Sequence, residues 1–395
     1  MKILLLHDYG TPTGGAELQM LALRRGLRER GHDARLLSSR AQLAPGPNVA
    51  DYTCFGSTTR LQVLSQTANP SAYRQLRRAL REFRPDVVHV RMFLWQLSPL
   101  ILPLLRDVPS VYQVVVFKPI CPIGSKLLPD GSPCHYPAGR ICLHTGCMTP
   151  QTWAVMMLQR RLWLRWRGVF DRVVTISRAM QERLEAEGIA PVGVIYNGVP
   201  ERPMRPPLSD PPTIAFAGRL VREKGIDVLL DATARLAREV PDLRVLIAGA
   251  GPERERLTAR IERLGLGRHV TLLGHLSREV LESCFDAAWV QAIPSRWEEP
   301  FGNVATEAMM RGTAVVASAF GGLAESVADG VTGLLVPPGD VESLTAALRA
   351  IIRDRDLAER MGRAGRERAR ALFSEARCVD HFEQLYREIS ASRAA

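Results

Sequence analysis

The chain has 395 residues, of which 46% are hydrophobic and 24% charged, a globular composition that excludes both a disordered chain and a small disulfide scaffold. At roughly 100 to 200 residues per domain, this length predicts about two or three domains, each with its own core. The formal net charge is +11, and the excess lies entirely in the first half: residues 1–200 hold 25 Lys and Arg against 13 Asp and Glu, whereas residues 201–395 hold 27 against 28.

The sequence shows neither of the usual signals for membrane insertion or export. Its apolar stretches fall far short of the roughly 18 to 20 residues that span a bilayer. Met1-Lys2 leads directly into the apolar run from Ile3 to Leu6, without the length or the small-residue cleavage site of a secretory signal. We therefore expect a cytoplasmic protein.

Apolar runs alternate with amphipathic stretches along both halves of the chain, which is the pattern of βα units. In the first half, a strand at 3–6 leads into a glycine-rich turn at 10–15 and a helix at 16–30. Further strands are expected there at 86–90, 110–116 and 173–176, and helices at 71–83, 153–166 and 178–187. In the second half, strands are expected at 213–217, 243–248, 269–273, 287–293 and 314–317, with helices between them.

Continuous apolar strands alternating with helices predict parallel sheets covered on both faces, so we expect an α/β protein with two Rossmann-like, doubly wound domains. Six prolines between Pro200 and Pro212 can form neither a helix nor a central strand, and they mark a linker. Because ligands of such sheets bind at the carboxyl ends of strands, two facing domains would enclose a cleft. The expected divisions are a first domain at 1–199, the linker at 200–212, a second domain at 213–373 and a helix at 374–395 that packs back toward the first domain.

The segment from Ser295 to Gly312 combines two carboxylates with a phosphate-binding pattern. A loop with Glu299 follows a strand, Gly302 permits close approach of a ligand to the backbone, and a helix then begins with free N–H groups that suit an anionic phosphate. Glu307 falls within that helix, so one carboxylate can face a sugar while the other accepts hydrogen bonds from ribose hydroxyls. The alternative is a pair of solvated carboxylates on a surface helix.

Two cations follow the first strand of the second half. Arg219 and Lys224 flank a turn between two glycines, at the carboxyl end of the strand. A forked guanidinium and a compact ammonium can together neutralise a diphosphate leaving group. Cations in a loop are often merely solvated, but the Glu299 segment favours the functional interpretation.

At these residues the sequence resembles the family 4 glycosyltransferases, which are retaining, nucleotide-sugar-dependent enzymes with two Rossmann-like domains in the GT-B fold. The resemblance covers nearly the whole chain. The motifs that carry it are Gly14-Gly15-Ala16-Glu17, Asp86-Val87-Val88-His89, Ile176-Ser177, Tyr196-Asn197-Gly198-Val199, Gly218-Arg219, Lys224-Gly225, Gly249-Ala250-Gly251-Pro252, the segment from Glu299 to Glu307, and Gly330-Val331-Thr332-Gly333-Leu334-Leu335-Val336.

The resemblance implies a role for each matched residue. Arg219 and Lys224 would hold the diphosphate, while Glu307 would bind the ribose. Glu299 would contact the donor sugar, and it is the third catalytic candidate beside Arg219 and Lys224. Gly14 and Gly15 would bind the donor in a loop that closes on phosphates and acceptor. The further donor-binding candidates are Gly218, Gly251, Phe301, Gly302 and the amides of Asn303 and Val304. The acceptor-side candidates are His7, Glu17, His89 and Arg91.

The chain departs from the family pattern at two positions. Many members place a His, usually followed by Asp, where this chain has Val115, so the donor-sugar contact of that His is absent. The family's frequent His-x-His after the 86–90 strand becomes His89-Val90-Arg91. In retaining GT-B enzymes the favoured mechanism is front-face attack, in which the departing phosphate takes the acceptor proton, so a histidine base is not required.

The resulting prediction is transfer of a sugar, with retention, from a nucleotide-diphosphate donor to a sugar, lipid-linked or small-molecule acceptor, in surface polysaccharide, glycolipid or glycoside biosynthesis. The rival hypothesis is a non-catalytic nucleotide-sugar-binding relative. We expect no cofactor for catalysis, because Arg219, Lys224 and helix N–H groups meet the diphosphate charge. Asp354-Arg355-Asp356 resembles a metal-binding Asp-x-Asp but is interpreted as a solvated helix junction. Gly249-Ala250-Gly251 resembles the start of a dinucleotide-binding motif, but Arg254 occupies the position of its third glycine.

Four of the seven cysteines cluster in a Pro- and Gly-rich loop at about 117–150. No pair has the two-residue spacing of common zinc knuckles, and a cytosolic compartment disfavours disulfides. Reduced thiols, a structural zinc site and a disulfide all remain open. The four candidate zinc ligands are Cys121, Cys134, Cys142 and Cys147.

The basic first half raises the prospect of an anionic partner. The stretch from Trp153 to Gly168 places Trp163 and Trp166 among arginines, which suits a helix on the anionic inner face of a membrane. The alternative is a domain helix whose tryptophans pack inward. Nucleic acid is not expected as a partner, because no nucleic-acid-binding module accompanies the charge.

Overall fold

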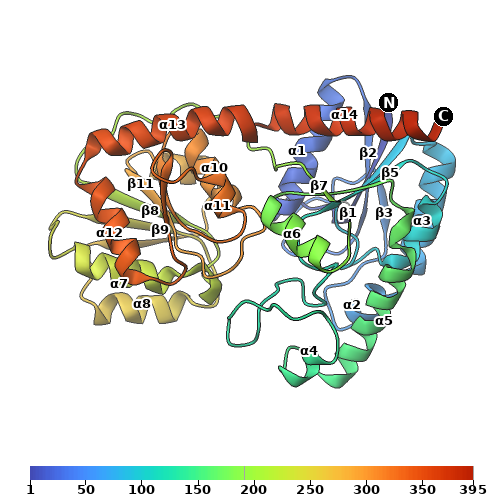
Figure 1. Cartoon of the computed structure of the whole chain (residues 1–395), viewed down its shortest axis with the longest axis horizontal. Coiled ribbons are helices and arrows are strands. Elements are labelled where there is room, and N and C mark those ends of the chain that lie inside the picture. Colours follow the sequence, from blue (N-terminus) through green and yellow to red (C-terminus); the bar gives the residue numbers. More distant parts are fainter. Residues whose placement is uncertain (191, 395) are drawn as a thin grey trace. The chain divides into compact units, whose positions relative to one another are not determined.

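In a computed structural model, which describes residues 1–190 and 192–394, the chain forms two compact units. Unit 1 comprises Met1–Asp130, Cys134–Gly198 and the segment from Glu375 onward. Unit 2 comprises Gly131–Pro133 and Val199–Ser374. Each unit is built on one parallel sheet, and Figure 1 labels their elements.

The sheet of unit 1 has seven parallel strands in the order β3-β2-β1-β4-β5-β6-β7. The strands are β1 (Lys2–Tyr9), β2 (Asp33–Ser39), β3 (Tyr52–Cys54), β4 (Val87–Val90), β5 (Ser110–Val114), β6 (Arg172–Thr175) and β7 (Val192–Val194). The helices are α1 (Gly15–Glu29), α2 (Gln62–Ser65), α3 (Pro70–Phe83), η1 (Pro99–Leu105), α4 (Ile141–His144), α5 (Pro150–Trp166), η2 (Arg167–Val169), α6 (Arg178–Ala186) and α14 (Glu375–Ala394).

The sheet of unit 2 has six parallel strands in the order β10-β9-β8-β11-β12-β13. The strands are β8 (Thr213–Ala217), β9 (Arg244–Ala248), β10 (Val270–Gly274), β11 (Val290–Ile293), β12 (Ala314–Ser318) and β13 (Gly333–Val336). The helices are η3 (Arg222–Lys224), α7 (Ile226–Leu236), α8 (Arg254–Arg263), α9 (Arg278–Cys284), α10 (Asn303–Met310), α11 (Leu323–Ser326), α12 (Val341–Ile352) and α13 (Arg355–Phe373).

The central strands β1, β4, β8 and β11 are buried on both faces, which explains why most of their residues are apolar. These findings confirm the prediction of two Rossmann-like, doubly wound domains. Strands β2, β3, β7 and β13 were not predicted from the sequence. Strand β2 is polar at both ends, β3 and β7 have only three residues each, and β13 has four residues and begins at a glycine. Helix α5 starts three residues before the predicted Trp153, where Thr149 caps it by accepting from the Thr152 amide and Pro150 takes the first turn.

The C-terminal helix α14 belongs to unit 1 and packs against α1. Phe382 and Tyr386 of α14 are fully buried in the same core as Ile3 and Leu5 of β1. Arg25 of α1 also pairs with Glu375 at 2.5 Å. Helix α14 therefore completes the core of unit 1.

Candidate active site

The two predicted donor motifs meet at one point of the unit 2 sheet. The loop after β8 carries Arg219 and Lys224, and the loop after β11 carries Glu299. Strand β8 pairs with β11 on one side and with β9 on the other, so the strand order reverses here. In doubly wound sheets, ligands bind at the carboxyl edge of such a switch point.

The loops after β8 and β11 are joined through their backbones. Gly225 has a φ of 67°, and a Cβ added to it would lie 1.9 Å from the carbonyl oxygen of Pro294. Only glycine tolerates both the conformation and the approach. The Arg296 amide also donates to the Glu223 carbonyl at 2.8 Å. These contacts fix Lys224 relative to the Glu299 loop.

Lys224 and Glu299 form an ion pair at this point. The Lys224 Nζ atom lies 2.5 Å from Glu299 Oε1, which also accepts a hydrogen bond from the Ser295 hydroxyl at 3.0 Å. The Glu299 side chain is 7% exposed, and the ammonium lies 5.4 Å from the centre of the Trp297 ring. The pair is thus held from several sides, and Ser295 and Trp297 are neighbours that sequence spacing did not single out.

Arg219 lies differently from Lys224. Its side chain is 71% exposed, and its guanidinium lies 3.6 Å from the Glu223 carboxylate in an ion pair along the loop. A surface pair of this kind contributes little to stability. The structure thus holds Lys224 firmly but leaves Arg219 in contact with solvent.

Helix α10 begins directly beside this pair. Gly302 caps it with a φ of 87°, and a Cβ there would collide with Leu323 at 2.4 Å. The amides of Asn303 and Val304 lie in the first turn, where no preceding turn of helix can accept their hydrogen bonds. Phe301 is buried and packs edge-on against Phe373, so its side chain supports the loop from inside.

Glu307 is paired with an arginine that sequence analysis did not identify. The Arg278 guanidinium of α9 donates to the Glu307 carboxylate of α10 at 2.9 Å. Surrounding protein raises the pKa of Glu307 by desolvation, while the charge of Arg278 acts in the opposite direction. Because Arg278 lies on a half-exposed helix in a charged stretch, its spacing carried no signal.

The glycines of the β8 and β9 loops allow these loops to touch. A Cβ on Gly251 would lie 2.3 Å from the Leu220 carbonyl, and one on Gly249 would lie 1.8 Å from that of Gly218. The Leu220 amide donates to the Ala250 carbonyl at 2.9 Å. The structure thus gives Gly251 a packing role beside β8, and donor contact by Gly218 and Gly251 stays a prediction.

In unit 1, the Gly14-Gly15 loop follows β1, which pairs with β4 at the point where that strand order reverses. Gly14 is the N-cap of α1, and the carboxylate of Glu17 folds back over it, 2.4 Å from where a Cβ would stand. This is the geometry of a helix-capping carboxylate. Burial raises the pKa of Glu17, against the opposing effects of nearby amides and of Arg91.

The remaining acceptor-side candidates are buried in this unit. His7 is fully buried, with Nδ1 3.0 Å from the Tyr9 carbonyl oxygen, and His89 Nδ1 lies 2.5 Å from the hydroxyl of Tyr386 in α14. Arg91 is 2% exposed and donates to the side-chain oxygens of Gln113 and Asn197 at 2.9 and 3.0 Å. These contacts give the three residues packing and network roles, and acceptor contact by His7, His89, Arg91 or Glu17 stays a prediction.

The cysteine loop does not assemble a metal site in the part of the chain that the structure describes. Within residues 1–190 and 192–394, no group of three or more His, Cys, Asp or Glu side chains is placed to hold a metal ion. Cys121, Cys134, Cys142 and Cys147 are all half-buried free thiols. Cys121, Cys134 and Cys147 all lie near enough to Cys142 to raise the pKa of its thiol, after the larger effect of burial, and the state of this cluster stays a prediction.

Two other sequence signals are resolved. Asp354 is the N-cap of α13 and accepts from the Leu357 amide at 2.8 Å, so the Asp354-Arg355-Asp356 run is a helix junction. Trp163 is 1% exposed and packs among Phe93, Tyr112 and Phe170. The expectation that Trp163 contacts a membrane is therefore wrong, because its ring completes the core beneath α5.

Comparisons with known proteins agree with this geometry. The family described as Glycosyl transferases group 1 matches residues 201–368, and the Glycosyl transferase 4-like domain matches residues 14–198. Glycogen synthase of Mycobacterium tuberculosis is 30% identical over 318 residues, which are 78% of this chain and 69% of that protein. The chain belongs to the family 4 glycosyltransferases, and it is therefore a glycosyltransferase with a nucleotide-sugar donor.

Further relatives match over part or all of the chain. D-inositol 3-phosphate glycosyltransferase of Mycolicibacterium smegmatis is 41% identical over 193 residues, 47% of this chain and 42% of that protein. Sucrose-phosphate synthase from Thermosynechococcus elongatus is 23% identical, with a TM-score of 0.75 over 99% of each chain. Anabaena HepE in complex with UDP-glucose is also 23% identical, with a TM-score of 0.68 over 99% of this chain and 100% of that one. These structures establish the GT-B fold.

Proposed function

We propose that this glycosyltransferase transfers a hexosyl group with retention of anomeric configuration. The Lys224–Glu299 pair at the switch point of unit 2 carries the proposal, because it joins a cation suited to a diphosphate and a carboxylate suited to a sugar. Arg219 and the α10 amides add charge stabilisation, and Glu307 holds the ribose. Among candidate donors, UDP-glucose is the first to test, since HepE was crystallised with it.

In the proposed step, the bond from the anomeric carbon to the diphosphate breaks while a bond to the acceptor oxygen forms on the same face of the sugar. The acceptor proton moves to the departing phosphate oxygen, so Val115 in place of a histidine does not prevent the reaction. Lys224 and Arg219 stabilise the charge that develops on the diphosphate. The acceptor is a sugar, a lipid-linked sugar or a small molecule of surface polysaccharide, glycolipid or glycoside biosynthesis.

The test is donor turnover with a panel of UDP- and GDP-sugars, with and without candidate acceptors. NMR of the product reads the anomeric configuration directly. We expect slow donor hydrolysis without acceptor, transfer with a suitable acceptor, and an anomeric configuration equal to that of the donor. Tight binding of a nucleotide sugar without hydrolysis or transfer would support the non-catalytic alternative, and an inverted product would contradict retention.

A further inference from the structure

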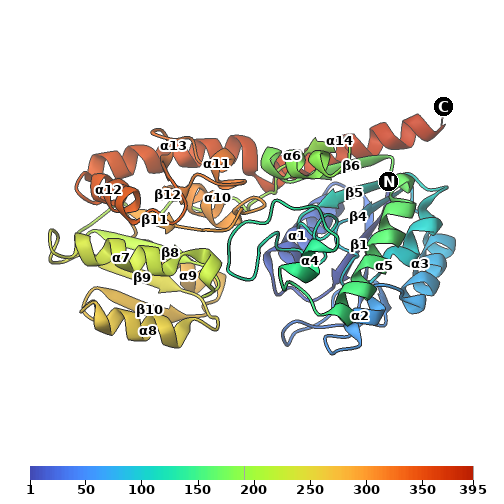
Figure 2. The same ribbon diagram turned by 60° about the horizontal axis from the view of Figure 1, so that its bottom comes forward.

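The positive charge of unit 1 gathers along two helices that share a neighbour. Both α3 and α5 pack against η1, and they lie next to each other in both views (Figures 1 and 2). Each helix buries one face in the unit and turns a row of arginines to solvent. Five of these exposed residues form what we call the arginine face: Arg74, Arg77 and Arg81 of α3, and Arg161 and Arg165 of α5.

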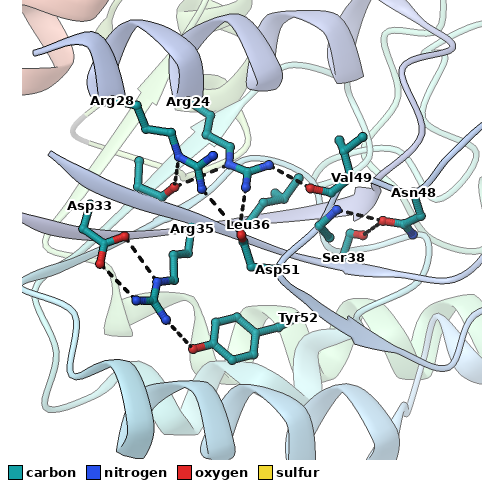
Figure 3. Close-up of polar contacts among 12 residues, drawn as sticks. Arg24, Arg28, Asp33, Arg35, Leu36, Ser38, Asn48, Val49, Asp51 and Tyr52 are labelled. Carbon is teal, nitrogen blue, oxygen red and sulfur yellow. Dashed lines mark hydrogen bonds and ion pairs between the residues drawn. The ribbon is translucent and has the colours of Figure 1, made fainter. Parts of the chain in front are cut away.

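The arginine face is not neutralised by carboxylates. Across the ranges that the structure covers, these five side chains take part in no ion pair, whereas neighbouring Arg78 pairs with Glu82 at 2.7 Å. On helix α1, by contrast, Arg24 and Arg28 both converge on Asp51 (Figure 3). The five unpaired guanidinium groups of α3 and α5 thus give unit 1 a positively charged surface that can attract an anionic partner.

An apolar patch adjoins the arginine face where α2 meets α5. Gln159 of α5 donates to the Gln66 carbonyl at the end of α2 at 2.6 Å, which holds the two helices together. Three leucines here, called the leucine patch, are exposed to solvent: Leu61 at 58%, Leu64 at 61% and Leu158 at 51%. Large apolar side chains beside a basic surface are the combination found at membrane interfaces.

We propose that unit 1 docks on an anionic phospholipid bilayer, with the arginine face on the headgroups and the leucine patch in the interface. Each basic residue near such a surface strengthens binding about five-fold. The three leucines have no ring that could stack on a base, which favours lipid over a single-stranded nucleic acid. In the described chain every helix is too short or too polar to cross a membrane, so the attachment is peripheral.

The patch also lies near the edge of unit 1 that would take an acceptor. Helix α2 follows the carboxyl end of β3, and helix α5 begins after the long loop that leaves the carboxyl end of β5. The leucine patch is therefore near the carboxyl ends of the strands, which is the edge that carries the Gly14-Gly15 loop. A lipid-linked acceptor held in the bilayer could reach that edge. This last step rests on the proposed function, whereas docking on the bilayer does not.

The experiment is sedimentation of the full chain with vesicles of phosphatidylcholine alone or mixed with phosphatidylglycerol. We expect binding only to the anionic vesicles, weakening as salt rises because exposed charges are screened. The triple variant R74E/R77E/R81E should bind at least about 100-fold more weakly. The matched control R238E/R263E/R360E reverses three exposed arginines of unit 2 and should bind as the native chain does.

A second variant separates apolar from electrostatic contributions. L61Q/L64Q/L158Q should weaken binding to anionic vesicles while leaving the salt dependence of the remaining binding unchanged. Donor hydrolysis in solution, which involves unit 2 residues, should survive in all three variants and shows that they fold. Equal binding to both vesicle types, unchanged binding by R74E/R77E/R81E, or tighter binding to an oligonucleotide than to vesicles would each overturn the proposal. None of these results bears on nucleotide-sugar transfer.

Discussion

The ammonium of Lys224 lies 2.5 Å from the carboxylate of Glu299, so the cation expected at the diphosphate and the carboxylate expected at the sugar are bonded to each other. The two residues are 75 positions apart and come from the loops after β8 and β11. A change in one therefore removes the ion-pair partner of the other. Arg219, which is exposed, has no such constraint.

The first prediction concerns these two cations. Arg219→Ala and Lys224→Ala should each lower turnover by roughly 100- to 1,000-fold, the usual effect of removing one preorganised charge-stabilising group. They should differ in stability, because Lys224→Ala leaves the buried Glu299 carboxylate without its ion pair, at about 1 to 3 kcal/mol, whereas Arg219→Ala removes only a surface contact. Steady-state kinetics and denaturant unfolding measure the two effects.

Arg222→Ala is the control for this pair of variants. The Arg222 side chain lies in the same loop, is 76% exposed and pairs only with Glu253 on the surface. It should keep native turnover and stability. Near-native transfer by Lys224→Ala would remove the role assigned to that residue.

The second prediction concerns Arg278 as a positioning residue for Glu307. Glu307→Gln should raise the donor KM about 10- to 100-fold with a smaller effect on kcat, because a charged hydrogen-bond acceptor for the ribose is lost. Arg278→Met should also raise KM, because Glu307 loses the 2.9 Å contact that orients it, and Arg278→Lys should restore part of the loss. The double variant should show less than the sum of the two free-energy effects. A native KM for Arg278→Met would show that Arg278 has no part in donor binding.

The fold and the meeting of the Lys224 and Glu299 loops at one edge of the unit 2 sheet could be predicted from the sequence for a common physical reason. Apolar runs in the sequence indicate buried parallel strands, and the carboxyl ends of these strands define one edge of the sheet. Lys224 and Glu299 were expected at that edge and are found paired there. Contacts that depend on distant packing left no such trace. His89 is buried by Tyr386, 297 positions away, and Trp163 by rings from β5 and two loops, so their burial could not be read from local spacing.

The third prediction concerns the cysteine loop. Because the seven cysteines are free thiols and no metal-ligand group forms among the described residues, thiol titration of the denatured, unreduced protein should find seven thiols per chain. Metal analysis of the same sample should find zinc well below one ion per chain. Three thiols would indicate two disulfides, and stoichiometric zinc released by mercurial titration of the thiols would show that the loop is a zinc site.

The last prediction concerns the pH dependence of unit 1 stability. Burial, assisted by the charge of Arg91, lowers the pKa of His7 and of His89 to about 3, against an unfolded value near 6.5. The unfolded chain therefore binds two more protons as pH falls below about 6.5, which destabilises the fold by about 1.4 kcal/mol per proton and pH unit. Burial raises the pKa of Asp8 to about 6 and also raises the pKa of Glu17, so below about pH 6 these two carboxyls bind protons more readily in the folded state and offset part of the loss. Calorimetry between pH 7 and 5 should show the unit 1 transition falling with acid, and His89→Gln should flatten that slope by one proton. A native slope for His89→Gln would contradict the assignment.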